Sequence, residues 1–262
     1  MTSKRPSTRV NEHFFIIGAQ RSGTTYLYSL LDSHPEIEMA RPLRPEPKFF
    51  LDDSRFDQGV VVYERAHFRQ KPGARLLGEK STSYMEHEKA ARRIAAIFPA
   101  AKIIALLRDP VERAISNYYF SVENGLETLN MDQAFRREAE RATQATTASV
   151  SPFAYLARGR YADYLEVYER FFPREQLIIL LTEQFTGSLE AYRSLCERLG
   201  VSNDYVPPEL HSRFNETGLP HAVPSPNLAK YLYDYYEPAN MRLAARYDLD
   251  LRCWPSFAPA GE

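Results

Sequence analysis

Residues 14–27 read FFIIGAQRSGTTYL, an apolar run followed by a loop that ends at Gly23 and then by the start of a helical pattern. The loop has the spacing of the phosphate-binding motif G-x-x-x-x-G-K-[ST], from Gly18 to Gly23 and Thr25. Thr24, however, stands where that motif has its lysine. The stretch therefore predicts a strand, an anion-binding loop and a helix, and it leaves open which anion the loop holds.

Backbone N–H groups along this loop can converge on one anion, and the first turn of the following helix adds its partial positive charge. Arg21 places a charged, forked donor inside the loop. An ordinary strand-to-helix turn, in which glycine supplies the geometry and threonine a cap, is the alternative interpretation. The residues expected to bind the anion are Arg21, Ser22, Gly23, Thr24 and Thr25.

Four short apolar runs indicate strands, at residues 14–18, 75–79, 102–107 and 176–181. Their apolar residues are continuous rather than alternating, which is typical of parallel strands that are buried on both faces. Segments with helical spacing lie between the runs, directly after Gly23, at 86–98 and at 161–172. This alternation predicts a P-loop-like, three-layer α/β fold in which helices flank a central, mostly parallel sheet, with the ligand at the carboxyl ends of the strands.

The composition is that of a single domain over residues 1–262, with irregular ends at 1–12 and 252–262. Its 33 basic and 34 acidic residues nearly cancel, so nothing suggests a nucleic-acid partner. The two cysteines, Cys196 and Cys253, fit neither a disulfide framework nor a zinc site, and they point to a reduced compartment. Since no apolar run is long enough to span a membrane, we expect a cytoplasmic protein without a transmembrane segment.

A second set of polar residues follows the third apolar run. Arg108 leaves the carboxyl end of that strand and Ser116 lies two turns along the next helix, so the pair suits a second, separate phosphate. For Arg108, a surface ion pair is the alternative. Asp109 is interpreted as the cap of this helix, with Glu112 completing a capping-box-like pattern, rather than as a magnesium ligand.

Two stretches together resemble the phosphosulfate-binding and 3′-phosphate-binding motifs of sulfotransferases that use 3′-phosphoadenosine-5′-phosphosulfate (PAPS): QRSGTTYL at 20–27 and LLRDPVERAISNYY at 106–119. Four further segments resemble the heparan sulfate sulfotransferases and their bacterial relatives, at residues 34–50, 78–85, 157–185 and 214–220. The resemblance implies PAPS as the sulfuryl donor, adenosine 3′,5′-bisphosphate (PAP) as the product, and no required metal. A loop that holds one phosphosulfate instead of a triphosphate would need no lysine at position 24.

The resemblance also implies three catalytic residues. Glu46 is the candidate general base, Arg21 would stabilise charge on the bridging and sulfuryl oxygens, and Lys80 would contact the sulfuryl oxygens or the acceptor. A solvated loop carboxylate is the alternative for Glu46, and an ion pair with Glu79 or another acid is the alternative for Lys80. His87 is an alternative base.

The chain departs from the family pattern at three positions. Arg21 replaces a lysine that the family commonly has, and unlike lysine it cannot give up a proton. Lys48 stands where the family has a histidine, and Arg213 is expected to compensate for lysine missing from FNETGLP at 214–220. The tyrosines between 155 and 168 are interpreted as core and cleft wall, with Tyr161 as the one candidate to approach the cofactor.

Together these patterns predict an enzyme that moves a sulfuryl group from PAPS to a hydroxyl or amine of a carbohydrate, lipid or other small-metabolite acceptor by in-line displacement. A P-loop kinase of a small metabolite is one alternative, but it would need magnesium and ATP, for which Thr24 and Arg108 are the wrong residues. A non-catalytic nucleotide-binding module is another. The sequence identifies neither the acceptor nor the oligomeric state.

Overall fold

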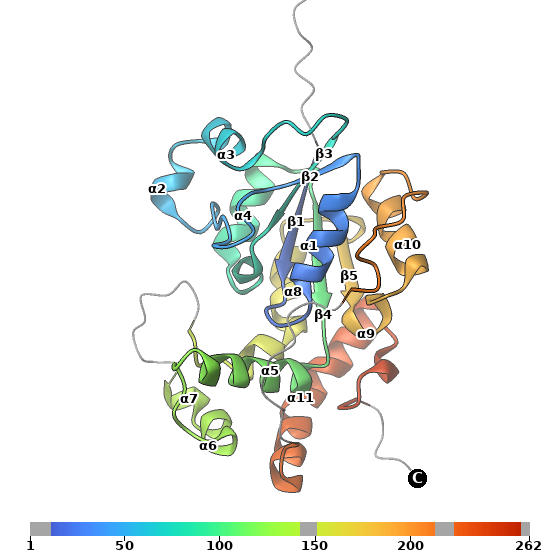
Figure 1. The fold of residues 1–262 in the computed structure, drawn as a ribbon. Coiled ribbons are helices and arrows are strands. Elements are labelled where there is room, and N and C mark those ends of the chain that lie inside the picture. Colours follow the sequence, from blue (N-terminus) through green and yellow to red (C-terminus); the bar gives the residue numbers. More distant parts are fainter. Residues whose placement is uncertain (1–11, 142–150, 213–222, 258–262) are drawn as a thin grey trace, which may run out of the picture.

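The computed structural model describes residues 12–141, 151–212 and 223–257. Within them, five strands form one sheet in the order β2-β3-β1-β4-β5, and every neighbouring pair is parallel. The strands are β1 (Glu12–Gly18), β2 (Ile37–Met39), β3 (Leu76–Lys80), β4 (Lys102–Leu107) and β5 (Leu177–Leu181). Helices lie on both sides of this sheet (Figure 1), so the predicted α/β fold with a central parallel sheet is confirmed.

The four predicted strands correspond to β1, β3, β4 and β5, and their ends lie within a residue or two of those expected. The edge strand β2 was not predicted, because its three residues are too few to show any periodicity. It is defined by its pairing with β3, in which Ile37 lies beside Leu76. The sheet therefore has one more strand than the apolar runs indicate.

Side chains of β1 alternate between two separate hydrophobic clusters. Phe14 and Ile16 pack into the cluster on one face, whereas Phe15 and Ile17 pack into the cluster on the other. Four helices supply the opposing side chains: α1 (Thr24–Ser33) and α10 (Leu189–Leu199) on the first face, and α4 (Glu88–Ile97) and α8 (Tyr161–Glu169) on the second. Burial on both faces explains why the strand sequence is continuously apolar.

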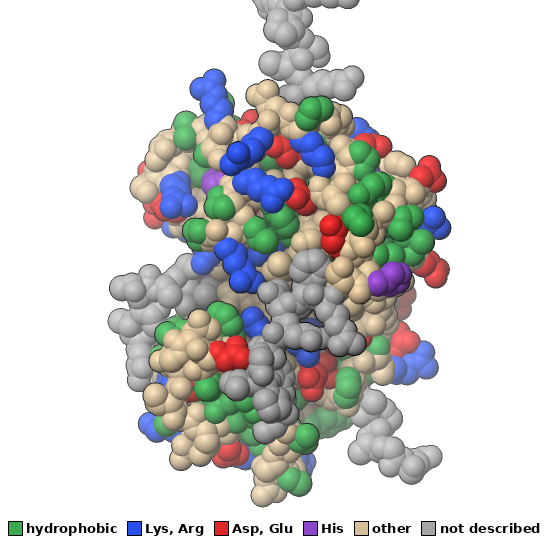
Figure 2. All heavy atoms as spheres, viewed as in Figure 1, with side chains coloured by type: hydrophobic (Ala, Val, Ile, Leu, Met, Phe, Trp, Pro, Cys, Tyr) green, Lys and Arg blue, Asp and Glu red, His purple; other side chains and the backbone are tan. Residues whose placement is uncertain are grey.

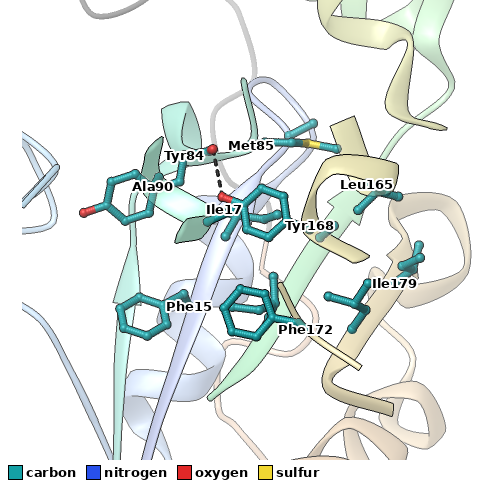
Figure 3. Packing of buried hydrophobic residues seen from close by; sticks show 14 of the residues in the cluster. Phe15, Ile17, Tyr84, Met85, Ala90, Leu165, Tyr168, Phe172 and Ile179 are labelled. Carbon is teal, nitrogen blue, oxygen red and sulfur yellow. Dashed lines mark hydrogen bonds between the residues drawn. The ribbon is translucent and has the colours of Figure 1, made fainter. Parts of the chain in front are cut away.

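The core on the α8 face combines close packing with buried hydrogen bonds, one of which is drawn in Figure 3. Phe15 of β1 and Ile179 of β5 lie in the same fully packed cluster as Phe172, which follows α8. The hydroxyl of Tyr168 donates to the carbonyl oxygen of Tyr84 over 2.8 Å. Truncating a buried phenylalanine of this kind to alanine costs about 3–5 kcal/mol, so this face contributes strongly to folding.

The remaining helices extend the molecule around this sheet. They are α2 (Asp53–Phe56), α3 (Val60–His67), α5 (Pro110–Glu123), α6 (Met131–Arg136), α7 (Glu138–Arg141), α9 (Thr182–Phe185) and α11 (Pro226–Tyr247), with short 3₁₀ turns at Thr82–Glu86, Ala157–Gly159, Arg174–Gln176 and Leu251–Cys253. Figure 1 shows α5, α6, α7 and α11 beyond the carboxyl ends of the strands. Buried side chains of α5, α6 and α11 form a third hydrophobic cluster there.

The two ends of the chain differ from the expectation of irregular structure. Glu12, expected to be irregular, is the first residue of β1, whereas residues 1–11 lie outside the described part. At the other end, a 3₁₀ turn covers Leu251–Cys253 and Trp254 is completely buried. The Trp254 indole N–H donates to Glu183 Oε2 over 2.9 Å, so the tail is anchored to the start of α9; residues 258–262 lie outside the described part.

Candidate active site

The carboxyl ends of four strands meet at one edge of the sheet and bring the predicted residues together. The loop to α1 follows β1, Lys80 ends β3, Arg108 follows β4, and Thr182 follows β5. Strands β1 and β4 are neighbours although β2 and β3 come between them in the sequence, and ligands of open α/β sheets bind at such a reversal of strand order. A cavity of about 1210 Å³ opens at this edge.

The cavity is lined by most of the predicted residues and by further basic side chains. Predicted residues on its wall are Arg21, Gly23, Thr24, Thr25, Glu46, Lys80, Arg108 and Ser116. Basic residues on its wall that were not assigned a role are Arg44, Lys48, Arg55 and Arg158. Figure 2 shows lysine and arginine side chains gathered near the middle of the molecule on the face that it presents.

The loop after β1 has the backbone geometry of an anion cradle. Gly23 has a φ of 83°, a left-handed conformation that favours glycine, and Gly18 is so close to Met85 that a Cβ would come within 2.7 Å of the Met85 sulfur. Arg21 also has a positive φ, of 67°. No side chain caps the N-terminus of α1 among the described residues, so the N–H groups of its first turn remain available to a ligand.

Hydrogen bonds with β4 and with the residue that follows β5 hold this loop in place. Ala19 N donates to the carbonyl oxygen of Leu106 in β4 over 2.8 Å. The Thr182 hydroxyl, at the end of β5, lies 2.8 Å from the carbonyl oxygens of both Ser22 and Leu107. Sequence reasoning missed this role of Thr182; the available signal was a hydroxyl residue directly after an apolar strand. Ser22 itself is completely buried and is not among the described residues that line the cavity, so its expected contact with the anion stays a prediction.

Arg21 connects the two predicted phosphate sites. Its Nε donates to Ser116 Oγ over 3.2 Å, and its guanidinium lies 4.8 Å from the centre of the Phe120 ring. Burial, and then the positive charge of Arg108, lower the pKa of Arg21, yet an arginine remains protonated at neutral pH. The two sites, expected to be separate, are therefore parts of one continuous cavity, in which the cations repel each other until an anion binds.

Arg108 is placed by both its side chain and its backbone. Its Nη2 pairs with Glu112 Oε2 at 3.2 Å, the ion pair considered as an alternative, while the residue still lines the cavity. Its carbonyl oxygen accepts a hydrogen bond of 2.8 Å from the hydroxyl of Tyr161, which is buried. Tyr161 is not among the described residues that line the cavity, so its place is behind Arg108 instead of against a cofactor.

The helix cap at Asp109 forms as predicted, but the capping box does not. Asp109 Oδ1 accepts hydrogen bonds from Val111 N at 2.8 Å and Glu112 N at 3.3 Å, and α5 begins at Pro110. In a capping box the Glu112 carboxylate would accept from Asp109 N. It pairs with Arg108 instead, and Asp109 N donates to Glu183 Oε1 over 2.9 Å. The Glu112 carboxylate is attracted to the adjacent Arg108 guanidinium. Asp109 N does not need Glu112 as its acceptor, because Glu183 accepts its hydrogen bond.

Glu46 and Lys80 form an ion pair within the cavity. Lys80 Nζ lies 2.5 Å from Glu46 Oε1, and Lys80 is only 4% exposed. Thr82 donates from its backbone N–H to Glu46 Oε2 at 2.9 Å and from its hydroxyl at 3.1 Å. The alternative for Lys80, an ion pair with an acid, is thus present, and its partner is the predicted base. The alternative for Glu46, a freely solvated carboxylate, is wrong, because three donors hold it.

Besides Ser22 and Tyr161, two more predicted residues are not shown at the cavity by the described structure. His87 lies at the start of α4 and is not among the described residues that line the cavity, which leaves it without access to an acceptor there. Arg213 and the segment 214–220 lie outside the described residues, so their expected contacts stay predictions.

Arg158 is a functional candidate that sequence reasoning missed. It lines the cavity although it is only 5% exposed, and its Nε pairs with Glu86 Oε1 at 2.9 Å. Its Nη2 donates to the carbonyl oxygen of Ser151 over 2.6 Å. The residue lies in the segment 157–185 that resembles the family, but nothing in its local spacing distinguishes a cavity arginine from a surface one.

Across residues 12–141, 151–212 and 223–257, no group of three or more His, Cys, Asp or Glu side chains is arranged to hold a metal ion. In the same part of the chain, no helix has the length and the apolar character that crossing a membrane requires.

Comparison with known proteins identifies the family. The profile of the sulfotransferase domain family matches residues 11–190. Human heparan sulfate glucosamine 3-O-sulfotransferase 6 is 28% identical over 262 residues, covering 90% of this chain and 72% of the human protein. Mouse heparan sulfate glucosamine 3-O-sulfotransferase 3B1 is 27% identical over 250 residues, covering 87% of this chain and 61% of the mouse protein. The crystal structure of a sulfotransferase from Alicyclobacillus acidocaldarius has 32% identity and a TM-score of 0.76, covering 94% of this chain and 99% of that one.

The chain therefore belongs to the sulfotransferase domain family, because the family profile spans more than half of it. The predicted class is confirmed: the protein is a sulfotransferase, a transferase of sulfuryl groups, in a family whose donor is PAPS. This chain spans less than two thirds of the length of the mouse relative. Glucosamine is the acceptor that the name of the mouse enzyme gives for that enzyme.

Proposed function

We propose that this protein binds PAPS at the carboxyl edge of the sheet and transfers its sulfuryl group to a hydroxyl or amine of a carbohydrate, lipid or other small metabolite. The observation that carries the proposal is that the uncapped N-terminus of α1, the Arg21–Ser116 contact, Arg108 and the Glu46–Lys80 pair all line one cavity. These groups fit a doubly phosphorylated nucleotide, because they combine main-chain donors, a hydroxyl and two guanidiniums.

Residues on the phosphate side of the cavity bind and neutralise the donor. We assign the first-turn N–H groups of α1 and the Arg21 guanidinium to the phosphosulfate, and Arg108 with Ser116 to the 3′-phosphate, because these residues line the cavity. Arg21 supplies positive charge near the bond that breaks but donates no proton to the leaving phosphate, since arginine does not titrate. Removing one preorganised donor of this kind typically lowers the rate by about 10²–10³-fold.

Residues on the opposite side prepare the acceptor. Glu46 accepts the acceptor's proton as its oxygen or nitrogen bonds to sulfur, while the bond between sulfur and the bridging oxygen breaks and PAP leaves. Thr82 orients the Glu46 carboxylate through two donors, and Lys80 pairs with that carboxylate and would contact the sulfuryl oxygens or the acceptor. General-base catalysis contributes about 10²–10⁴-fold to such reactions. No metal is needed, because guanidinium and ammonium groups neutralise the charge.

We also propose that residues 1–262 act as one domain and that the protein works in the cytoplasm. Both cysteines are free, Cys196 in the core and Cys253 half-buried, which agrees with a reducing compartment.

Ligand binding and turnover test the proposal separately. At a concentration of 100 times Kd, PAP would stabilise the fold by about 2.7 kcal/mol, which for a chain of this size raises Tm by about 5–10 °C. ATP with magnesium at the same concentration should give a much smaller shift. A screen of glycan, lipid and small-metabolite acceptors with labelled PAPS then tests transfer. Stabilisation by ATP–magnesium and not by PAP would overturn the proposal in favour of a kinase.

A further inference from the structure

A buried carboxylate lies directly beneath the loop that carries Glu46. Glu79 precedes Lys80 on β3, and because side chains alternate along a strand, the two project to opposite faces of the sheet. Lys80 reaches the cavity, whereas Glu79 is 1% exposed and is not among the described residues that line it. Burial raises the pKa of Glu79, although hydrogen bonds from three hydroxyl groups partly offset this effect.

Three hydroxyl groups donate to the Glu79 carboxylate. Tyr63 Oη lies 2.6 Å from Oε2, and Ser81 Oγ lies 2.6 Å from Oε1. The third donor is the hydroxyl of Tyr84. A carboxylate can accept all three bonds at once, whereas a glutamine amide would present two N–H donors to hydroxyl groups that need an acceptor.

Two of these hydroxyl groups also accept hydrogen bonds from the backbone of the loop that carries Glu46. Ser81 Oγ accepts a hydrogen bond of 3.0 Å from Lys48 N, and Tyr84 Oη accepts one of 3.1 Å from Phe50 N. Each hydroxyl has one proton, and because that proton is donated to Glu79, the lone pairs face the loop N–H groups. Glu79 thereby fixes the direction of both hydrogen bonds from below.

The loop needs such support because its backbone is strained. Lys48 has a φ of 51°, in the left-handed region that residues other than glycine seldom adopt. Leu51 N and Asp52 N donate back to the Lys48 carbonyl oxygen at 3.0 and 3.3 Å and close a tight turn there. Glu46 is two residues before Lys48, so a shift of the turn would move its carboxylate away from Thr82 and Lys80.

We propose that Glu79 is a positioning residue for sulfuryl transfer: through Ser81 and Tyr84 it holds the strained turn at Lys48 and so aims the Glu46 carboxylate into the cavity. This inference rests on the proposed function of Glu46 as the base. In this proposal Glu79 contacts neither donor nor acceptor. The buried network supports the acceptor side of the site and not the phosphate side.

The network contains its own control. Tyr63 donates to the same carboxylate but packs against the phenylalanines Phe49, Phe50 and Phe68. No hydrogen bond from its hydroxyl to the loop backbone is present in the described structure. Tyr63→Phe therefore removes a buried hydrogen bond of similar geometry without removing a link to the loop.

The test compares Ser81→Ala and Tyr84→Phe with Tyr63→Phe in the full chain. Leaving a buried N–H without its acceptor should lower kcat by about 10-fold or more in the first two variants, while Tyr63→Phe stays within about 3-fold of the parent. The Tm shift produced by PAP should be unchanged in all three. Ser81→Thr, which restores a hydroxyl, should recover most of the lost kcat. Glu79→Gln should lower kcat by a similar factor to Ser81→Ala and Tyr84→Phe, which are called the link variants.

Hydrogen–deuterium exchange of the peptide covering residues 46–50 gives a readout that does not depend on activity. Exchange should speed up in Ser81→Ala and Tyr84→Phe and stay near the parent rate in Tyr63→Phe. Unchanged exchange in the link variants, or equal loss of kcat in all three, would overturn the proposal. If the parent transfers sulfuryl to no acceptor, the proposed function fails, whereas exchange still decides whether Glu79 holds the loop.

Discussion

The phosphate side and the acceptor side of the cavity are built on different physical principles. On the phosphate side, the proposed donors are the N-terminus of α1 and the pair Arg108 and Ser116, which lie before and within α5, and each set comes from a short continuous segment. On the acceptor side, Glu46 and Lys80 come from segments 34 residues apart and meet through side chains. The backbone donors are fixed once their helix forms, but the ion pair depends on everything that supports the loop. The acceptor side should therefore be the more sensitive of the two to single substitutions.

The largest effect is expected on the acceptor side. Glu46→Gln removes the proton acceptor while keeping the shape of the side chain, so kcat should fall by about 10²–10⁴-fold. The stabilisation by PAP should not change, because Glu46 does not contact the nucleotide. Steady-state kinetics with labelled PAPS and a thermal shift with PAP measure the two quantities. Asp57→Asn, which changes an exposed carboxylate near α2, is the control and should leave both unchanged. Full activity of Glu46→Gln would remove the basis for treating the two sides differently.

A large effect on the affinity for PAP is expected when Arg108 is replaced. Arg108→Ala removes a charged donor from the 3′-phosphate, and such hydrogen bonds are worth about 1.5–3 kcal/mol, so PAP should bind about 10–150-fold more weakly. Isothermal titration with PAP measures this change. Arg252→Ala is a suitable control, since that side chain is 83% exposed and pairs only locally with Asp250. Unchanged PAP affinity in Arg108→Ala would mean that the 3′-phosphate binds elsewhere.

A moderate effect is expected when the helix cap behind Arg108 is removed. Asp109→Ala removes the acceptor for Val111 N and Glu112 N and also the acceptor for Ser256, and cap losses cost about 0.5–2 kcal/mol of stability. Urea unfolding measures this loss. Asn130→Ala removes the corresponding cap of α6, at Gln133 N, and should lower stability by a similar amount. Only Asp109→Ala should also weaken PAP binding, by a few fold, and equal PAP affinities in the two variants would contradict this.

The smallest effect is expected from a pair of tyrosines on α8. Tyr161→Phe removes the hydrogen bond to the Arg108 carbonyl and should cost about 0.5–1.5 kcal/mol, with PAP binding about 3-fold weaker. Tyr168→Phe removes a bond of the same 2.8 Å length to the Tyr84 carbonyl. It should cost similar stability without changing PAP affinity. Chemical denaturation and PAP titration of both variants compare the two sides of the site within one helix. A weaker PAP complex in Tyr168→Phe would show that the sides are coupled.

Much of the fold could be predicted because its signals are local. Continuous apolar runs identified β1, β3, β4 and β5, since strands covered on both faces carry mostly apolar side chains. The three residues of β2 gave no such signal, because that strand exists only through its pairing with β3. The capping box was expected from local spacing, but Arg108 competes for Glu112 and Glu183 satisfies Asp109 N. The capping rule fails there because a neighbouring arginine takes Glu112 and a glutamate distant in the chain takes Asp109 N.

The residues proposed to bind phosphate could be recognised in the sequence for the same reason, whereas the contact between them could not. A glycine loop before a helix and an arginine after a strand can be recognised from residues 14–27 and 102–119 alone. That Arg21 contacts Ser116 depends on β1 and β4 being neighbours, which strand order decides and spacing does not. Arg158 and the Glu79 network stayed hidden because a polar residue's burial is set by what packs against it.

The amino-acid sequence by itself determined the strand-loop-helix unit that is proposed to bind anions, the alternation of strands and helices, and the family to which the chain belongs. Each of these depends on residues that are close together in the chain, so periodicity, caps and motifs record them. Only the tertiary structure decided that two phosphate sites form one cavity, that Lys80 pairs with Glu46, and that Glu79 supports the loop between them. Those contacts join segments brought together by the order of the strands, and side-chain hydrogen bonds choose their partners only after the sheet has placed them within reach.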